Sequence, residues 1–220
     1  KDVASPKVYV IDDQTPYGTG LRDAANDYIT AQKVTKVGSD SVAQKTSDYS
    51  ATVAKIKNSG ANIVIYTGYY PDGGALAKAL NDASWKGQFI GGDGVLNSAY
   101  IDVAGKAAAE GTKFTAPAVP FEVVANAAQQ AAFTKATGLK TAAGHVYVTE
   151  TFNATNVFLS CIAKGATTRA KIQDCVTNGS FLTIDGKTTI KFTFAGEVVG
   201  GAPVGGFQVV NGVIKYFGAV

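Results

Sequence analysis

The amino-acid sequence predicts an α/β protein: a lobe with a doubly wound parallel sheet, plus an incomplete second lobe. In the first half of the chain, short β-branched runs alternate with amphipathic stretches, at about thirty residues per unit. After Pro117 the alternation stops, and helical stretches follow with no buried strand between Phe121 and Ser180. The last residues, 204–220, return to a strand–turn–strand pattern. These three observations divide the chain into 1–118, 119–203 and 204–220.

In the first of these segments, apolar runs bounded by turn-forming residues predict buried strands. The expected strands are 8–11, 34–37, 62–66, 88–91 and 111–115. Helices are expected between them at 18–31, from Ser47 or Asp48 to 57, at 73–83 and at 96–103. Ligand sites on parallel sheets lie beyond the carboxyl ends of the strands. The loops that could carry function are therefore 12–20, 66–74 and 91–97.

The second half is expected to be helical, at 126–137, 147–164 and 168–176. These helices have apolar faces but no sheet of their own to cover, so their partner surface is expected to lie outside this chain. The end of the chain predicts a hairpin, with strands 206–210 and 213–217 around the turn Asn211-Gly212.

Composition and charge exclude several classes of protein. Of the 220 residues, 46% are hydrophobic and 17% are charged, as in ordinary globular domains. The net charge of +3 comes from 20 basic and 17 acidic residues spread along the chain. Since they form no basic run, we expect no nucleic-acid partner and no membrane-surface partner. The sequence contains no Met, so we expect a processed product or an excised piece of a longer protein.

The two cysteines, Cys161 and Cys175, flank a helical stretch and a short turn. In a reducing compartment they would be two buried thiols, whereas in an exported protein they could close a loop and add about 3 kcal/mol of stability. We favour the disulfide, which in turn favours an oxidising compartment. With no further Cys or His beside them, no metal site is expected.

The three strand-end loops each contain one residue suited to binding a small solute. In 14–20, a lone Gly-x-Gly is a weak phosphate signal, and the loop is either a tight turn or the support of a Tyr17 that walls the crevice. In 66–74, Pro71 and the glycines predict an irregular loop, in which one of the adjacent Tyr69 and Tyr70 packs and the other faces the crevice, or both simply pack. In 91–97, Asp93 either caps the next helix or provides a charge that pairs with a ligand cation.

Signals for an enzyme are weak. The single histidine, His145, has no nucleophile motif around it, and Gly-x-Ser-x-Gly is absent. Dinucleotide and P-loop fingerprints are absent too, so no cofactor is expected. Asp12 and Asp13 after the first strand are compatible with a phospho-acceptor receiver domain, but such a domain needs an Asp where this chain has 66–68, Tyr-Thr-Gly.

At the three loops the sequence resembles the branched-chain amino acid (Leu/Ile/Val-type) substrate-binding proteins of ABC transporters, which have the type I periplasmic-binding-protein fold. Residues 8–20 are similar to the family's strand followed by Asp, a short spacer and Tyr-Gly-x-Gly. Residues 63–74 are similar to its Tyr-x-Gly-Tyr-Tyr-Pro loop, and 88–97 to its Gln-Phe-x-Gly-x-acid-Gly segment. All three occur in the same order and at the same spacing as in the family.

The resemblance implies two α/β lobes joined by three crossings, which close on an amino acid. Two ligand-contacting tyrosines of the family fall on Tyr17 and Tyr69, and an aromatic residue near the start of the long helix falls on Tyr147. The Glu that binds the ligand's ammonium falls on Asp93, which is one methylene shorter. No catalytic residue is implied.

This chain begins where the second lobe of the family begins, so it is expected to be a C-terminal portion that lacks the core of the N-terminal lobe. Residues 119–203 would be the remainder of lobe one. The implied role is an extracytoplasmic solute-binding component that delivers its ligand to an ABC permease, and the exposed helix faces predict self-association of the truncated chain. Two alternatives remain: the ligand-sensing ectodomain of a receptor, and a small α/β enzyme.

Overall fold

The computed structural model describes residues 3–139, 142 and 145–220. The chain divides into two compact units. Unit 1 comprises Lys1–Ala116 together with Gly206–Val220, and unit 2 comprises Pro117–Gly205.

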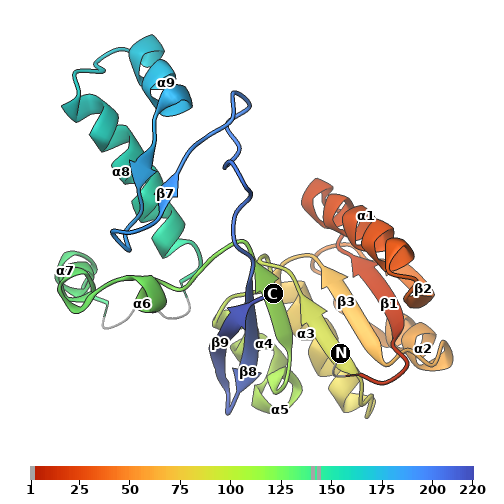
Figure 1. Cartoon of the computed structure of the whole chain (residues 1–220). Helices are drawn as coiled ribbons and strands as arrows, with labels where there is room; N and C mark the ends of the chain where they lie inside the picture. The colour runs from red at the N-terminus through yellow and green to blue at the C-terminus, as the bar shows by residue number, and fades with distance from the viewer. Residues whose placement is uncertain (1–2, 140–141, 143–144) are drawn as a thin grey trace. The chain divides into compact units, whose positions relative to one another are not determined.

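A seven-stranded sheet with flanking helices forms unit 1 (Figure 1). Its strands are β1 (Lys7–Asp12), β2 (Thr35–Ser41), β3 (Ile63–Thr67), β4 (Gln88–Gly91), β5 (Lys113–Ala116), β8 (Gly205–Val210) and β9 (Val213–Ala219). The strand order is β2-β1-β3-β4-β5-β8-β9, and β1 pairs in parallel with both β2 and β3. The order reverses at β1, so the crevice beyond the ends of β1 and β3 is the point where such sheets bind ligands.

The helices of unit 1 are α1 (Pro16–Ala31), α2 (Ser50–Asn58), α3 (Tyr70–Asp82), α4 (Ala99–Ala104) and α5 (Lys106–Ala109). Thr15 caps the start of helix α1, where its side chain accepts the Gly18 amide, and Pro16 is the first residue of the helix. Helix α3 packs against α4 and α5. Strands β3 and β4 bury Val64, Tyr66 and Phe89.

Helix α3 corrects one sequence-based prediction. An irregular loop was expected at 66–74, with the helix starting at 73, but the helix begins at Tyr70. Pro71 is compatible with the first helical turn because the amide it lacks has no acceptor there. Gly73 and Gly74 lie inside the helix, where a Cβ would come within 3.0 Å of Tyr66 and 2.9 Å of Val103. They therefore serve close packing and do not provide an open loop.

Unit 2 contains the helices α6 (Phe121–Val124), α7 (Ala127–Thr137), α8 (Val148–Ala163) and α9 (Arg169–Asn178) and a two-stranded sheet of β6 (Phe181–Leu182) and β7 (Thr189–Ile190). Asn126 and Gln129 form a capping box at the start of α7. The pair β6–β7 was not expected, because two-residue strands leave almost no alternation to recognise.

Two small apolar cores hold unit 2 together. One surrounds Phe121 and Ile184, and the other surrounds Val157 and Phe181. A disulfide between Cys161 and Cys175 lies in the second core and joins α8 to α9.

The outer face of α8 remains exposed. No charged residue occurs from 151 to 163. Four large apolar side chains in this stretch are exposed: Phe152, Phe158, Leu159 and Ile162. A charge-free helix face with several exposed apolar side chains is typical of a surface that packs against another element.

Candidate functional site

Three of the four residues predicted from the sequence come together at the carboxyl ends of neighbouring strands. Tyr17 lies in the first turn of α1, after β1, and Tyr69 is the residue before α3, after β3. Asp93 follows β4. We call this group, Tyr17, Tyr69 and Asp93, the tyrosine–aspartate cluster.

The Tyr17 hydroxyl is fixed between two groups of the same turn. It donates to Asp93 Oδ1 at 2.6 Å and accepts the Gly94 amide at 3.1 Å. Burial raises the pKa of the Tyr17 phenol above its ordinary value, and the hydrogen bond to Asp93 raises it further. The phenol therefore stays protonated and acts as the donor, while Asp93 is the acceptor.

Tyr69 provides the second aromatic wall. Its ring centroid lies 5.0 Å from that of Tyr17, with the two planes inclined by 33°. This offset geometry is favourable for aromatic pairs. Tyr69 remains 40% exposed, so part of its aromatic surface faces solvent.

Glycines let the three loops touch. A Cβ on Gly94 would lie 2.7 Å from the carbonyl oxygen of Gly68 and 3.0 Å from the ring of Tyr17. The Tyr70 amide also donates to the Gly94 carbonyl oxygen at 2.9 Å. Direct backbone contact therefore joins the loops after β3 and β4, and any side chain at Gly94 would force them apart.

A buried polar layer supports the cluster from behind, and sequence analysis did not identify it. Asp13 is buried and accepts the Thr15 hydroxyl at 2.6 Å and the Gln44 side chain at 3.1 Å. The Thr67 hydroxyl lies 2.8 Å from the carbonyl oxygen of Gly18. The only signal in the sequence was the pair Asp12-Asp13 at a strand end, which was considered only in terms of receiver-domain chemistry.

Asp12 is equally buried but serves a different purpose. It accepts bonds from the Ser41 hydroxyl at 2.8 Å, the Gln14 amide at 2.9 Å and Arg22 at 2.7 Å. Burial alone would raise the pKa of this carboxyl, but the three bonds outweigh it and hold the pKa below its ordinary value. The Asp12 carboxylate is thus ionised, and its bonds link β1 to β2 and α1.

The fourth predicted residue, Tyr147, belongs to unit 2. It is the residue before α8 and has a left-handed backbone, with φ at 69° and ψ at 16°. Such a conformation is uncommon for a non-glycine residue and is often found at functional positions.

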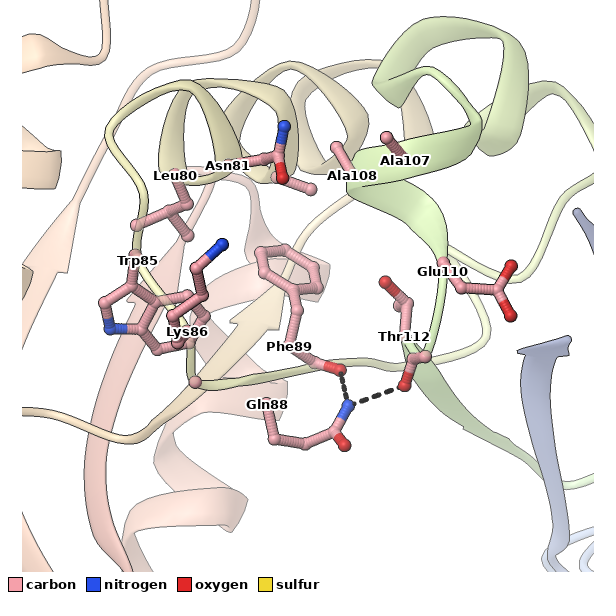
Figure 2. A pocket seen from close by; sticks show the side chains of 13 residues that line it. Leu80, Asn81, Trp85, Lys86, Gln88, Phe89, Ala107, Ala108, Glu110 and Thr112 are labelled. Carbon is pink, nitrogen blue, oxygen red and sulfur yellow. Dashed lines mark hydrogen bonds between the residues drawn. The ribbon is translucent and has the colours of Figure 1, made fainter. Parts of the chain in front are cut away.

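A separate pocket of about 280 Å³ lies at the amino ends of β4 and β5, whereas the tyrosine–aspartate cluster lies beyond the carboxyl ends of the strands (Figure 2). Its polar walls are already engaged within the fold. The Gln88 side-chain amide donates to the carbonyl oxygens of Phe89 and Gly111, both at 2.8 Å. The Glu110 carboxylate accepts the amides of Asn211 and Gly212 in the β8–β9 turn. This pocket is remote from the tyrosine–aspartate cluster, and these bonds give its lining a structural role.

In the part of the chain that the structure describes, no group of three or more His, Cys, Asp or Glu side chains is arranged to hold a metal ion. Within the same residues, no helix has the length and apolar character needed to cross a membrane.

Comparison with known proteins gives close relatives. Over 115 residues, the chain is 40% identical to Leu/Ile/Val-binding protein homolog 3 of Brucella melitensis, and the match covers 52% of this chain and 31% of that protein. It is 36% identical over 115 residues to the Leu/Ile/Val-binding protein BraC3 of Rhizobium johnstonii, again covering 52% and 31%. The matched part thus spans about a third of the length of these curated relatives.

Solved structures share the fold. The leucine-binding protein LivK of Thermotoga maritima superposes with a TM-score of 0.82 at 20% identity, over 97% of this chain and 60% of that one. The branched-chain amino acid transporter substrate-binding protein LivJ of Streptococcus pneumoniae, solved with isoleucine, gives 0.80 at 18% identity, over 99% and 60%. The family model described as "periplasmic binding protein" matches residues 1–202. With this match over most of its length, the chain belongs to the periplasmic binding protein family.

Proposed function

We propose that this chain is part of an extracytoplasmic solute-binding component of an ABC transporter, and that the whole protein binds an amino acid between two lobes. The single observation that carries the proposal is the contact between Tyr17 and Asp93. It fixes a carboxylate beside two aromatic rings at the switch point of the sheet. That arrangement suits the ammonium end of an amino acid.

The chemistry of the cluster favours a cation over an anion. Asp93 supplies negative charge, and the faces of Tyr17 and Tyr69 attract cations through their ring quadrupoles. Because Tyr17 already holds one carboxylate oxygen, Asp93 is oriented before a ligand arrives. A pre-oriented group loses less conformational freedom on binding.

In this proposal, unit 1 is lobe two, which the sequence predicted at 1–118 and 204–220, and unit 2 is the remainder of lobe one, which it predicted at 119–203. The charge-free outer face of α8 supports that assignment, because exposed apolar side chains on a helix are typical of a face that packs against another element. So does the fraction of the solved relatives that the chain spans, 60% of LivK. Tyr147 would then contribute an aromatic contact from lobe one.

We further propose binding without turnover. Relatives of this chain carry names of binding proteins for Leu, Ile and Val, and the tyrosine–aspartate cluster includes no nucleophile beside a general base. Membership of the periplasmic family supports an extracytoplasmic location, and delivery to a membrane permease is part of the same proposal. The disulfide agrees with an oxidising compartment.

Isothermal titration calorimetry with Leu, Ile and Val tests the proposal on the whole protein. We expect binding by the wild type and a loss of at least about tenfold in affinity for Asp93→Asn, which keeps the shape and removes the charge. Asp102→Asn, an exposed acid on α4, is the control and should bind as the wild type does. Equal affinities for Asp93→Asn and the wild type would refute the role of Asp93. The 220-residue chain alone should bind weakly or not at all.

A further inference from the structure

Thr67 lies directly behind the tyrosine–aspartate cluster, at the carboxyl end of β3, and is 1% exposed. Its hydroxyl oxygen lies 2.8 Å from the carbonyl oxygen of Gly18 and 3.2 Å from that of Ile11. Gly18 is in the first turn of α1, and Ile11 is in β1. One buried hydroxyl thus joins two neighbouring strands to the helix turn that contains Tyr17.

The other side of the same turn is held just as firmly. The Gly18 amide donates to the Thr15 hydroxyl oxygen at 2.9 Å, and that hydroxyl donates to Asp13 Oδ1 at 2.6 Å. The Thr15 amide also donates to Asp13 Oδ1, at 3.0 Å. Because Asp13 is buried at the end of β1, these bonds tie the turn to the sheet.

There is little space for the turn to move. A Cβ on Gly18 would overlap the Asp13 carboxylate and come within 2.5 Å of the Thr67 carbonyl oxygen. Tyr17 immediately precedes Gly18, so a shift of the turn displaces the phenol from Asp93. The 2.6 Å contact between them leaves little tolerance for such a shift.

We propose that Thr67 is a positioning residue of the site: through the carbonyl group of Gly18, its hydroxyl holds Tyr17 where the phenol meets Asp93. Valine has nearly the same shape, so a packing role could be filled by either residue. A buried hydroxyl is costly unless it is bonded, and here it is bonded to the element that carries Tyr17. The consequence for ligand affinity rests on the proposed function, whereas the tether itself does not.

The test uses Thr67→Val, Thr67→Ser and Thr67→Ala in the 220-residue chain labelled with 3-fluorotyrosine. Fluorine NMR resolves individual tyrosines, and Tyr17→Phe identifies the Tyr17 resonance by its loss. The readout is the ionisation of Tyr17 as the pH is raised within the range where the protein stays folded. Thr112→Val is the matched control, since Thr112 is also buried and bonded, to the Tyr100 hydroxyl at 2.9 Å.

Thr67→Val should make Tyr17 about three- to tenfold more acidic, because loss of the tether weakens its bond to Asp93 by an amount typical of one hydrogen bond. Thr67→Ser should behave as the wild type does. Thr112→Val should lower stability and leave Tyr17 unchanged. If Thr67→Val does not fold, Thr67→Ala removes the same hydroxyl without the β-branch and is expected to have the same effect on Tyr17.

The proposal is overturned if Thr67→Val leaves the ionisation of Tyr17 where the wild type has it. It is also overturned if Thr112→Val moves that ionisation as far, since the effect would then be general loosening. In the whole protein, Thr67→Val should weaken amino-acid binding about three- to tenfold. If Tyr17 responds but the wild-type whole protein binds no amino acid, the tether stands and the proposed function fails.

Discussion

The phenol oxygen of Tyr17 lies 2.6 Å from Asp93 Oδ1, although the two residues are 76 positions apart in the chain. The contact links the loop after β1 to the loop after β4 across the intervening strand β3. It turns two separate sequence features into one polar group with a defined orientation.

Tyr17→Phe should destabilise the chain by about 1–2 kcal/mol, because Asp93 and the Gly94 amide both lose a partner. Urea denaturation measures the change. Tyr28→Phe is the control: Tyr28 lies on the same helix and is 67% exposed, so it should change the free energy of unfolding by less than about 0.5 kcal/mol. Equal effects of the two substitutions would contradict a structural role for the Tyr17 hydroxyl.

Gly94→Ala should cost about 1–3 kcal/mol, since the new Cβ would lie 2.7 Å from the Gly68 carbonyl oxygen. Gly20→Ala is its counterpart. No atom lies within 4 Å of a Cβ there, and the residue is inside α1, so alanine should be neutral or stabilise by up to about 1 kcal/mol. Thermal denaturation of the two variants should therefore shift in opposite directions, and a harmless Gly94→Ala would show that the loops are not in close contact.

Reduction of Cys161–Cys175 should lower the stability of unit 2 by about 3 kcal/mol, because the bond closes a short loop between α8 and α9. Urea denaturation followed by circular dichroism, with and without reductant, measures the loss. The single tryptophan, Trp85, lies in unit 1, so its fluorescence transition provides an internal control and should move little. Two transitions unchanged by reductant would contradict a stabilising role for the disulfide.

Stability should decline in acid through Asp185. Hydrogen bonds from the Thr188 and Thr183 hydroxyls, and then from backbone amides, hold the pKa of this carboxyl well below its ordinary value. A pKa lowered by folding adds stability above the unfolded pKa of about 4, and that stability is lost as the pH falls toward the folded pKa.

Urea denaturation between about pH 6 and pH 3 should therefore show a falling free energy of unfolding, with a shallower slope in Asp185→Asn. Asp27→Asn, which removes an exposed acid on α1, should keep the wild-type slope. An identical slope in wild type and Asp185→Asn would exclude Asp185 as a source of acid sensitivity.

The exposed face of α8 should cause the isolated chain to self-associate at high concentration. Phe158 and Leu159 on this face are 52% and 55% exposed, with no charge nearby on the helix. Phe158→Lys should reduce the association measured by sedimentation velocity, whereas Tyr28→Lys, which adds the same charge to unit 1, should not. A wild-type chain that stays monomeric at high concentration would contradict this prediction.

Most elements of the fold were predictable from the sequence because their signals are local. Alternating strands and helices marked unit 1, Asn211-Gly212 marked the β8–β9 hairpin, and Asn126 marked the start of α7. The start of α3 was predicted wrongly. The sequence Tyr-Pro-Asp-Gly-Gly is typical of a turn, and only the close approach of Tyr66 and Val103 explains glycines inside a helix.

For the site, the sequence by itself determined which residues stand at the strand ends: Tyr17, Tyr69 and Asp93. It could not determine that the Tyr17 hydroxyl bonds Asp93, or that Thr67 reaches the Gly18 carbonyl group, 49 positions away. The physical reason is that strand order and backbone approach, and not sequence spacing, decide which polar groups meet. Periodicity places a side chain on an element, but tertiary packing selects its partner.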